Sequence, residues 1–320
     1  MKNKKYILVT GGCGFVGTIL VNRLLEENFK VKVIDTQWFG NYLIKHKNLR
    51  IIKKDYRNLK SKDLNRVGSI IHLANIANDP GVELNPNLSW EINVLGLENL
   101  LRISKNKGIK QFIYASSGSV YGIKKEKKVT ENLNLVPIST YNKSKMIAER
   151  VILSYSDKKF KTHIIRPATV CGISPRMRLD VSVNLLTYQA VKFKKITLFG
   201  GKQIRPNIHI KDLANVFMYF IKNSSLNSGF YNAGFENISL INLAKKIKKK
   251  TNCKIDIKNI VDLRSYRLSS KKLLRTGFKP LYGVSSAIDE IIKQFNLGKL
   301  KNIESCFTVK WMKKMKLDKI

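Results

Sequence analysis

Thr10-Gly11-Gly12-Cys13-Gly14-Phe15-Val16-Gly17 lies between an apolar run of strand length, Tyr6–Val9, and a segment of helical periodicity, Val16–Glu27. The pattern G-x-G-x-x-G occurs within it, at Gly12, Gly14 and Gly17. Such glycines let backbone N–H groups approach a pyrophosphate, and the N-terminus of the following helix adds the positive end of its dipole. A lone match also fits an ordinary tight turn, but the strand–turn–helix context favours a dinucleotide site.

Apolar runs of strand length alternate with amphipathic helical segments over the first half of the chain. This repetition is typical of βαβ units around a parallel sheet. The predicted strands are Tyr6–Val9, Val31–Ile34, Arg50–Ile52, Ser69–Leu73, Gln111–Ala115 and Thr162–Ile165. The predicted helices between them include Val16–Glu27, Trp90–Asn106 and Ser144–Ser156. The sequence therefore predicts an α/β fold with a Rossmann-type doubly wound parallel sheet.

The regular alternation weakens after about Gly172, where Pro, Arg and Gly interrupt shorter elements. We therefore expect two closely packed parts. Residues 1–172 form the dinucleotide-binding Rossmann domain, and 206–228 return to it. Residues 173–205 and 229–320 form a smaller part that binds the substrate.

Asp35 ends the second predicted strand, where a carboxylate accepts hydrogen bonds from the adenosine ribose of a dinucleotide. It repels a 2′-phosphate, and the next residues, Thr36-Gln37-Trp38, supply no Arg to hold one. NAD is therefore the predicted cofactor in preference to NADP. Asp55, just after the third strand, reaches the adenine edge or is a plain turn residue, and the sequence leaves both interpretations open.

Hydroxyl groups follow the fifth predicted strand, in Ser116-Ser117-Gly118-Ser119-Val120-Tyr121. Further along, Tyr141 and Lys145 have the i, i+4 spacing that places both on one helix face. A phenol, with an ordinary pKa near 10, is a poor base at neutral pH, and a nearby ammonium lowers that pKa. In that setting Tyr141 exchanges a proton with a hydroxyl group while a hydride moves to or from the cofactor. Alone, Y-x-x-x-K fits a solvated helix face, but its order after the glycines and serines favours catalysis.

Together these motifs resemble the extended short-chain dehydrogenase/reductase superfamily, and within it the NAD-dependent epimerase/dehydratase family that acts on nucleotide sugars. The resemblance runs from Thr10 to about Phe278. It implies that Ser117 steadies the substrate oxygen, that Tyr141 is the acid/base, and that Lys145 modulates Tyr141 and binds the nicotinamide ribose. The predicted cofactor contacts are Gly11, Gly14, Phe15, Val16, Gly17, Asp35, Asp55, Leu73, Ala74, Asn75, Asn93, Tyr141 and Lys145.

Three positions depart from the family pattern. Asn75 stands where many relatives have Ala, and Gly118 and Ser119 stand where the 4,6-dehydratase branch carries adjacent Asp and Glu. Because those carboxylates carry the protons of a dehydration, that reaction is disfavoured. We expect a nucleotide-sugar 4-epimerase that transiently oxidises C4. A 4-dehydrogenase or 4-ketoreductase shares the first half-reaction and is the alternative, and a dinucleotide sensor without catalysis is a third.

A nucleoside diphosphate needs fixed cations, and Arg suits it through bidentate hydrogen bonds to phosphate oxygens. The resemblance makes Arg205 the foremost such residue. For Arg176, Arg178 and Arg264 an ordinary surface position is an equal interpretation. The predicted substrate-binding residues are Ser117, Ser119, Arg176, Arg178, Asn184, Arg205 and Arg264.

Lysine and arginine number 60 against 22 aspartate and glutamate, which gives a net charge of +38. On charge alone this favours nucleic acid, an anionic membrane or a phosphorylated ligand. The lysines are scattered and not gathered into a stripe with aromatic residues, so we predict no nucleic-acid partner. The basic tail Phe307–Ile320 fits a packed helix or a frayed end better than a segment lying on a membrane.

The four cysteines are far apart and fit neither a zinc site nor a disulfide framework, so no metal is predicted. No apolar run approaches the roughly 18 to 20 residues of a membrane-spanning helix. We therefore expect a soluble, cytoplasmic protein. The resemblance also implies a homodimer formed through Trp90–Asn106 and Ser144–Ser156.

Overall fold

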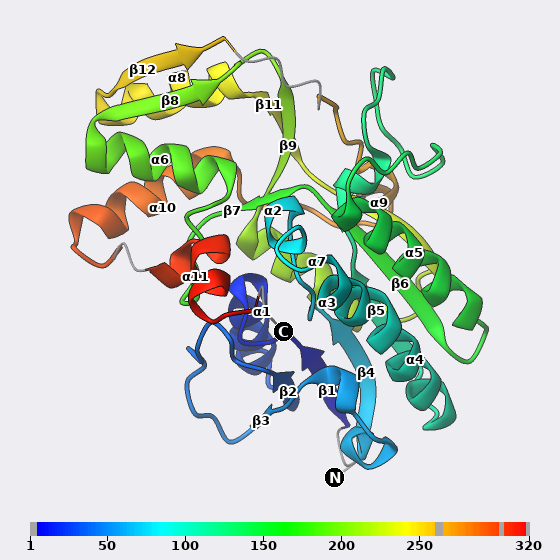
Figure 1. The fold of residues 1–320 in the computed structure, drawn as a ribbon. Helices are drawn as coiled ribbons and strands as arrows, with labels where there is room; N and C mark the ends of the chain where they lie inside the picture. Colours follow the sequence, from blue (N-terminus) through cyan, green and yellow to red (C-terminus); the bar gives the residue numbers. More distant parts are fainter. Residues whose placement is uncertain (1–4, 260–264, 301–303, 318–320) are drawn as a thin grey trace.

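The computed structural model describes residues 5–259, 265–300 and 304–317 and is built around a seven-stranded parallel sheet (Figure 1). The strand order is β10-β6-β5-β4-β1-β2-β3. The strands are β1 (Tyr6–Thr10), β2 (Val31–Asp35), β3 (Leu49–Lys53), β4 (Val67–His72), β5 (Gln111–Ala115), β6 (Lys161–Pro167) and β10 (Gly229–Ala233). The predicted doubly wound sheet is confirmed, and the six predicted strands match to within two residues at each end.

Helices cover both faces of this sheet, with α1 and α7 on one face and α4 and α5 on the other (Figure 1). Their bounds are Phe15–Glu26, Ile210–Lys222, Gly96–Asn106 and Thr140–Tyr155, respectively. Successive side chains of a strand point to opposite faces. Ile7 and Val9 of β1 therefore join the core under α1 and α7, while Leu8 joins the core under α4 and α5. Burial on both faces explains why the strands are continuous apolar runs.

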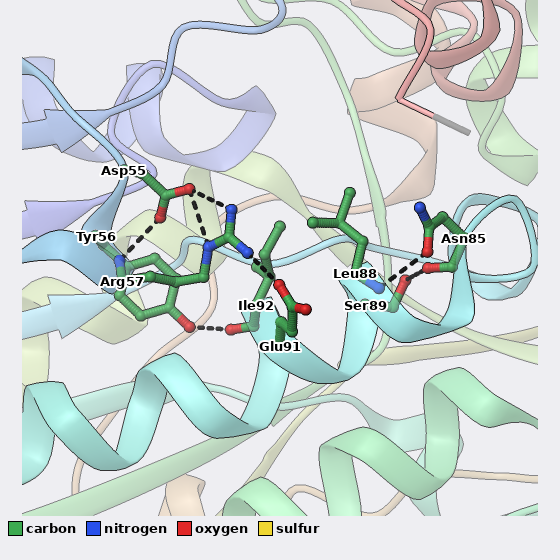
Figure 2. Close-up of polar contacts among 8 residues, drawn as sticks. All are labelled: Asp55, Tyr56, Arg57, Asn85, Leu88, Ser89, Glu91 and Ile92. Carbon is green, nitrogen blue, oxygen red and sulfur yellow. Dashed lines mark hydrogen bonds and ion pairs between the residues drawn. The ribbon is translucent and has the colours of Figure 1, made fainter. Parts of the chain in front are cut away.

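The single helix predicted over Trp90–Asn106 is wrong in detail, because three segments occur there. They are α3 (Pro86–Trp90), a π-helical turn (Glu91–Leu95) and α4. Within the turn, the carbonyl of Ile92 accepts a hydrogen bond from the hydroxyl of Tyr56 (Figure 2). Turns of this kind are frequent at functional sites. The π-helical segment is a single short turn next to an α-helix, and apolar periodicity over so few residues did not distinguish it from α-helix.

The smaller part contains a three-stranded sheet, β11-β9-β7, and a parallel pair, β12 and β8, with helices packed around them (Figure 1). Its strands are β7 (Thr169–Cys171), β8 (Lys195–Phe199), β9 (Ile204–His209), β11 (Glu236–Ser239) and β12 (Lys254–Lys258). Its helices are α6 (Ser182–Phe193), α8 (Leu240–Thr251) and α10 (Val284–Asn296). Val183, Leu243 and Ile288, one from each helix, meet in one apolar core. The short helices α2 (Asp79–Val82) and α9 (Lys271–Arg275) connect larger elements.

Two segments assigned by the sequence to the smaller part return to the large sheet. β10 pairs with β6, although 229–320 was expected to lie outside the Rossmann domain. The C-terminal helix α11 (Thr308–Lys314) places Met312 in the same core as Leu8 and Val82. Both returns depend on contacts between distant segments, which local periodicity does not report.

The basic tail is packed as far as the structure describes it, since Met312 is 2 % exposed and Leu317 is 3 % exposed. The last part of that tail, 318–320, lies outside the described residues. Among the helices in the described ranges, none has both the length and the apolar character that crossing a membrane requires.

Candidate active site

A cavity of about 810 Å³ lies where β1, β2, β4 and β5 end, and the smaller part and α11 form its other walls. Residues that end or follow these strands line it, for example Gly14, Asp35, Ala74 and Ser117. Arg205 of β9 lines it from the smaller part. Ligands of doubly wound folds bind at this edge of the sheet, and the volume is in the range of ligand sites. This cavity is therefore the candidate active site.

The glycine loop joins β1 to α1 in the conformation that its motif predicts. Gly11 has a φ of +72°, and a Cβ there would stand 2.6 Å from a backbone nitrogen of the segment after β4. A Cβ on Gly17 would overlap the carbonyl oxygen of Gly11. Gly14 caps α1 and lines the cavity together with Phe15 and Val16. Because the first turn of α1 carries no acidic residue, the positive end of its dipole is left for an anion.

Asp35 ends β2 beside the glycine loop. Its carboxylate accepts hydrogen bonds from the backbone N–H groups of Cys13, at 2.9 Å, and Gln37, at 2.6 Å. Burial raises the pKa of Asp35, and the two backbone hydrogen bonds and the charge of Arg176 oppose that rise. The carboxylate is thus fixed in the cavity wall, in the position that binds ribose hydroxyls in this class of fold.

Asp55 follows β3 and lines the same cavity. Its carboxylate accepts the backbone N–H of Arg57 at 2.8 Å and lies 2.8 Å from the Arg57 guanidinium (Figure 2). The guanidinium in turn lies 2.6 Å from Glu91 in the π-helical turn. Asp55 is therefore a turn residue that also lies in the cavity wall, and its contact with the adenine edge stays a prediction.

Leu73, Ala74 and Asn75 follow β4 and line the cavity. Within the described part of the chain, the buried Nδ2 of Asn75 has no hydrogen-bond partner, which leaves a donor for a ligand. Asn93 does not line the cavity, contrary to its predicted cofactor contact. Its amide instead bonds the backbone N–H and carbonyl of Ile76, at 2.9 and 3.1 Å, and so holds the wall from behind.

Ser117 and Tyr141 come together in the cavity, although 24 positions separate them in the sequence. The Ser117 hydroxyl lies 2.7 Å from the Ser119 hydroxyl, and its polar interaction with the Tyr141 phenol lowers the pKa of that phenol. Tyr141 is in the first turn of α5, which begins at Thr140 and not at the predicted Ser144, because Ser139 accepts the N–H of Asn142 at 3.2 Å and caps the helix. Because Ser117 and Tyr141 line the same cavity, their two hydroxyls can contact one substrate oxygen.

Lys145 lies one turn after Tyr141 but points its ammonium elsewhere. Nζ donates to the carbonyl of Ala115 at 2.7 Å and to the hydroxyl of Tyr114 at 3.2 Å. It lies 5.9 Å from the centre of the Tyr141 ring. Burial lowers the pKa of Lys145 to about 7, and the charge of Glu149 opposes this.

The pKa of Tyr141 is set by burial and by the groups around the phenol. Burial raises it to about 12, and the hydrogen bond from Ser117 is the largest opposing effect. The charge of Asp79 also raises it, whereas Arg178 and a backbone hydrogen bond with Asn78 lower it. In this structure the charge of Arg178 also favours the phenolate form of Tyr141, and the role of Lys145 as its modulator stays a prediction.

A buried ion pair supports this arrangement. Arg166 of β6, 2 % exposed, contacts Glu149 of α5 at 2.7 Å. The Ser116 hydroxyl donates to the same carboxylate at 2.5 Å, and Arg166 also donates to the hydroxyl of Tyr121 at 2.8 Å. The network ties α5 to the ends of β5 and β6, so it fixes the helix that carries Tyr141 and Lys145.

The predicted substrate-binding residues separate into three groups. Arg176, Arg178, Arg205 and Ser119 line the cavity. Asn184 does not: its amide bonds the backbone of Gly172, at 2.9 and 3.0 Å, and the carbonyl of Arg178, so it holds the loop that carries the two arginines. Arg264 lies outside the described residues.

Several wall residues had no signal in the sequence. Tyr266 places its hydroxyl 3.3 Å from where a Cβ of Gly118 would stand, and burial raises its pKa. Phe39, Thr308 and Met312 also line the cavity. Tyr266 lies in an irregular segment and Thr308 and Met312 in the tail, and no local motif marks either region.

A doubly wound sheet with a glycine loop, an acidic residue ending β2, a Ser after β5 and a Tyr and Lys on the next α-helix defines an enzyme of the short-chain dehydrogenase/reductase type. Within that class, the chain belongs to the NAD dependent epimerase/dehydratase family, whose family model matches residues 7–234. NAD is the cofactor of this family. The residues present fit it: Asp35 is fixed in the wall, and Asn75 has a buried donor without a partner in the described ranges.

The chain is similar to a putative UDP-glucose 4-epimerase of Methanocaldococcus jannaschii, with 31 % identity over 70 % of this chain and 76 % of the relative. It is also similar to UDP-glucuronic acid decarboxylase 1 of Xenopus tropicalis, with 26 % identity over 92 % of this chain and 73 % of the relative. Among solved structures, the UDP-N-acetylglucosamine 4-epimerase of Methanobrevibacter ruminantium matches with a TM-score of 0.82 and 24 % identity, covering 91 % of this chain and 99 % of that one. The structural match supports the fold.

Proposed function

We propose that this protein is a nucleotide-sugar 4-epimerase that oxidises C4 transiently. The observation that carries the proposal is that Ser117 and Tyr141 line the same cavity as the glycine loop and Asp35. Similarity to the putative 4-epimerase of Methanocaldococcus jannaschii supports it. A Gly and a Ser, at 118 and 119, where dehydratases carry Asp and Glu, weigh against dehydration.

The residues divide the work as follows. The glycine loop, Asp35 and Asn75 hold NAD, which supplies a hydride acceptor and donor at the sugar C4. Tyr141 takes the proton of the C4 hydroxyl and later returns it. Ser117 donates a hydrogen bond to the same oxygen while carbonyl character grows. Arg178 favours the phenolate form of Tyr141, and Arg205 provides a cation for the diphosphate.

The experiment is interconversion of UDP-glucose and UDP-galactose, and of their N-acetylamino counterparts, followed by NMR without added cofactor. Measurement of co-purified NAD accompanies it. Epimerisation by protein with bound NAD supports the proposal. Net NADH formation from a sugar nucleotide, or consumption of added NADH with a 4-keto sugar, identifies the alternative 4-dehydrogenase or 4-ketoreductase. NAD binding without turnover of any probe identifies a sensor.

We also propose a homodimer that forms through the outer surfaces of α4 and α5. Two apolar side chains on this side of the molecule are exposed, Leu95 by 65 % and Ile147 by 37 %. Light scattering should give twice the 36.6 kDa chain mass. Leu95→Arg with Ile147→Arg should give the monomer, while Ile44→Arg, which changes a side chain 77 % exposed in the loop after β2, should not.

We place the protein in the cytoplasm. All four cysteines, Cys13, Cys171, Cys253 and Cys306, are free and buried, as expected in a reducing compartment. Fractionation of cells that express the chain tests this.

A further inference from the structure

We propose that Arg176, in the loop after β7, binds a phosphate group of the NAD cofactor and not the diphosphate of the substrate. The sequence assigned this residue to the substrate, with an ordinary surface position as the alternative. The inference rests on NAD as the cofactor of the family and is independent of which reaction the sugar undergoes.

The first argument is a buried cation with few partners. Arg176 is 4 % exposed, and its side chain lines the cavity. Nη1 donates over a long 3.4 Å to the carbonyl of Met177, and in the described residues the buried Nε has no hydrogen-bond partner. Burying a guanidinium without an ion-pair partner is costly, and an anionic ligand removes that cost. The side chain therefore fits an anion that arrives in the cavity.

The second argument is position within the cavity. The Arg176 guanidinium lies 4.0 Å from the centre of the Phe39 ring, and its charge lowers the pKa of Asp35. Both residues belong to the end of β2 and the segment after it, which receives the adenosine half of a dinucleotide in this fold. By contrast, the charge of Arg178 acts on Tyr141, at the reacting end. Two arginines with a single residue between them thus serve opposite ends of the cavity.

The third argument is that the segment carrying the Phe39 ring, which lies against the Arg176 guanidinium, is fixed by hydrogen bonds. The indole Nε1 of Trp311 in α11 donates to the carbonyl of Trp38 at 2.6 Å, so the C-terminal helix fixes the segment that carries Phe39. The carbonyl of Cys306 accepts the N–H of Leu179 at 2.8 Å, which fixes the loop that carries Arg176 from the other side. A guanidinium stacked on a ring and fixed at both sides is prepared for a bidentate contact with phosphate.

Arg176 keeps its charge at neutral pH. Burial and, to a smaller extent, the charge of Arg178 lower its pKa to about 10, and the charge of Asp180 opposes both. The group is a cation under ordinary assay conditions, as binding of a phosphate requires.

Calorimetric titration of the full-length protein, freed of bound nucleotide, tests the proposal with NAD, NADP and UDP as separate probes. Arg176→Gln should weaken NAD binding about tenfold or more and leave UDP binding within about twofold. Arg176→Lys keeps the positive charge but cannot make the bidentate contact, so its affinity for NAD should lie between those of Arg176→Gln and the wild type. Arg275→Gln, at an exposed position of the short helix α9, should match the wild type for every probe.

A second variant keeps the test sharp if Arg176→Gln folds poorly. Phe39→Leu retains the cation but removes the ring beneath it, and it should weaken NAD binding by a smaller factor while UDP binding is unchanged. If Arg176→Gln weakened UDP binding and left NAD binding unchanged, Arg176 would bind the substrate diphosphate, as the sequence predicted, and the proposal would be overturned. Equal loss of both, loss of neither, or a loss confined to NADP would also overturn it. Failure of the 4-epimerase assay leaves this binding experiment unaffected.

Discussion

The ammonium of Lys145 lies 5.9 Å from the centre of the Tyr141 ring and donates its hydrogen bonds to Ala115 and Tyr114. Burial raises the pKa of Tyr141 to about 12 and lowers that of Lys145 to about 7. The phenol is therefore protonated at neutral pH in the ligand-free site. Its use as a base depends on the ligands that arrive and on Arg178.

Tyr141→Phe removes the group that exchanges the C4 proton. We expect kcat to fall by at least about a hundredfold, because general acid–base catalysis contributes factors of that size. Tyr155→Phe is the matched control, since Tyr155 lies on the same helix and hydrogen-bonds Glu98 at the surface. It should retain wild-type turnover in the same NMR assay. Full turnover by Tyr141→Phe would exclude the assigned base.

Arg178→Gln should move the pH profile of kcat toward alkaline pH. The groups that face Tyr141 are Arg178, Asp79, Ser117 and the N–H of Asn78, with Lys145, Tyr114 and Tyr266 around them. Among these, loss of Arg178 removes a positive charge that lowers the pKa of the phenol. A shift of about one pH unit is expected, which is about tenfold in rate at neutral pH. Arg178→Lys should restore most of the wild-type profile, and identical profiles for all three proteins would contradict this role.

Lys145→Met should alter the pH dependence of stability in the cofactor-free protein. The pKa of Lys145 falls from 10.5 to about 7 on folding. Between these values the unfolded chain binds a proton that the folded chain lacks, so the free energy of unfolding rises with pH, by at most about 1.4 kcal/mol per unit. The variant lacks this contribution. Urea unfolding at pH 7, 8 and 9 should show that the free energy of unfolding rises more steeply with pH in the wild type than in the variant. Equal slopes would contradict the lowered pKa of Lys145.

Tyr56→Phe tests the hydrogen bond that fixes the π-helical turn. The carbonyl of Ile92 loses its donor, and an unsatisfied buried acceptor costs about 1–3 kcal/mol of unfolding free energy. Tyr42→Phe changes a tyrosine that is 37 % exposed and should cost far less. Urea unfolding of both variants at one pH measures the difference. Equal stabilities would show that the Tyr56 bond adds nothing to the fold.

The part of the site that sequence predicts well is local. The glycine loop, Asp35, Ser117 and Tyr141 follow from a strand end or from a motif within a few residues, and the fold brings all of them to one cavity. Their positions depend on the regular geometry of a parallel sheet, which the apolar pattern reports.

The part that sequence missed depends on the direction of side chains and on distant contacts. Asn93 was predicted to contact the cofactor and Asn184 the substrate, but each amide hydrogen-bonds a backbone segment behind the cavity wall. The Arg176 guanidinium lies over the Phe39 ring. Helix α11 is held by a hydrogen bond between Trp311 and Trp38, which are 273 positions apart. No periodicity or motif encodes such pairs.

The most direct test of the central claim is to follow a deuterium label at C4 of UDP-glucose during turnover by protein with its co-purified NAD. A hydrogen that leaves C4 and returns to it within one closed site stays with the sugar. We predict that the UDP-galactose formed retains the deuterium at C4 and that no NADH accumulates. Loss of the label to solvent, or a 4-keto product with accumulating NADH, would contradict 4-epimerisation by transient oxidation.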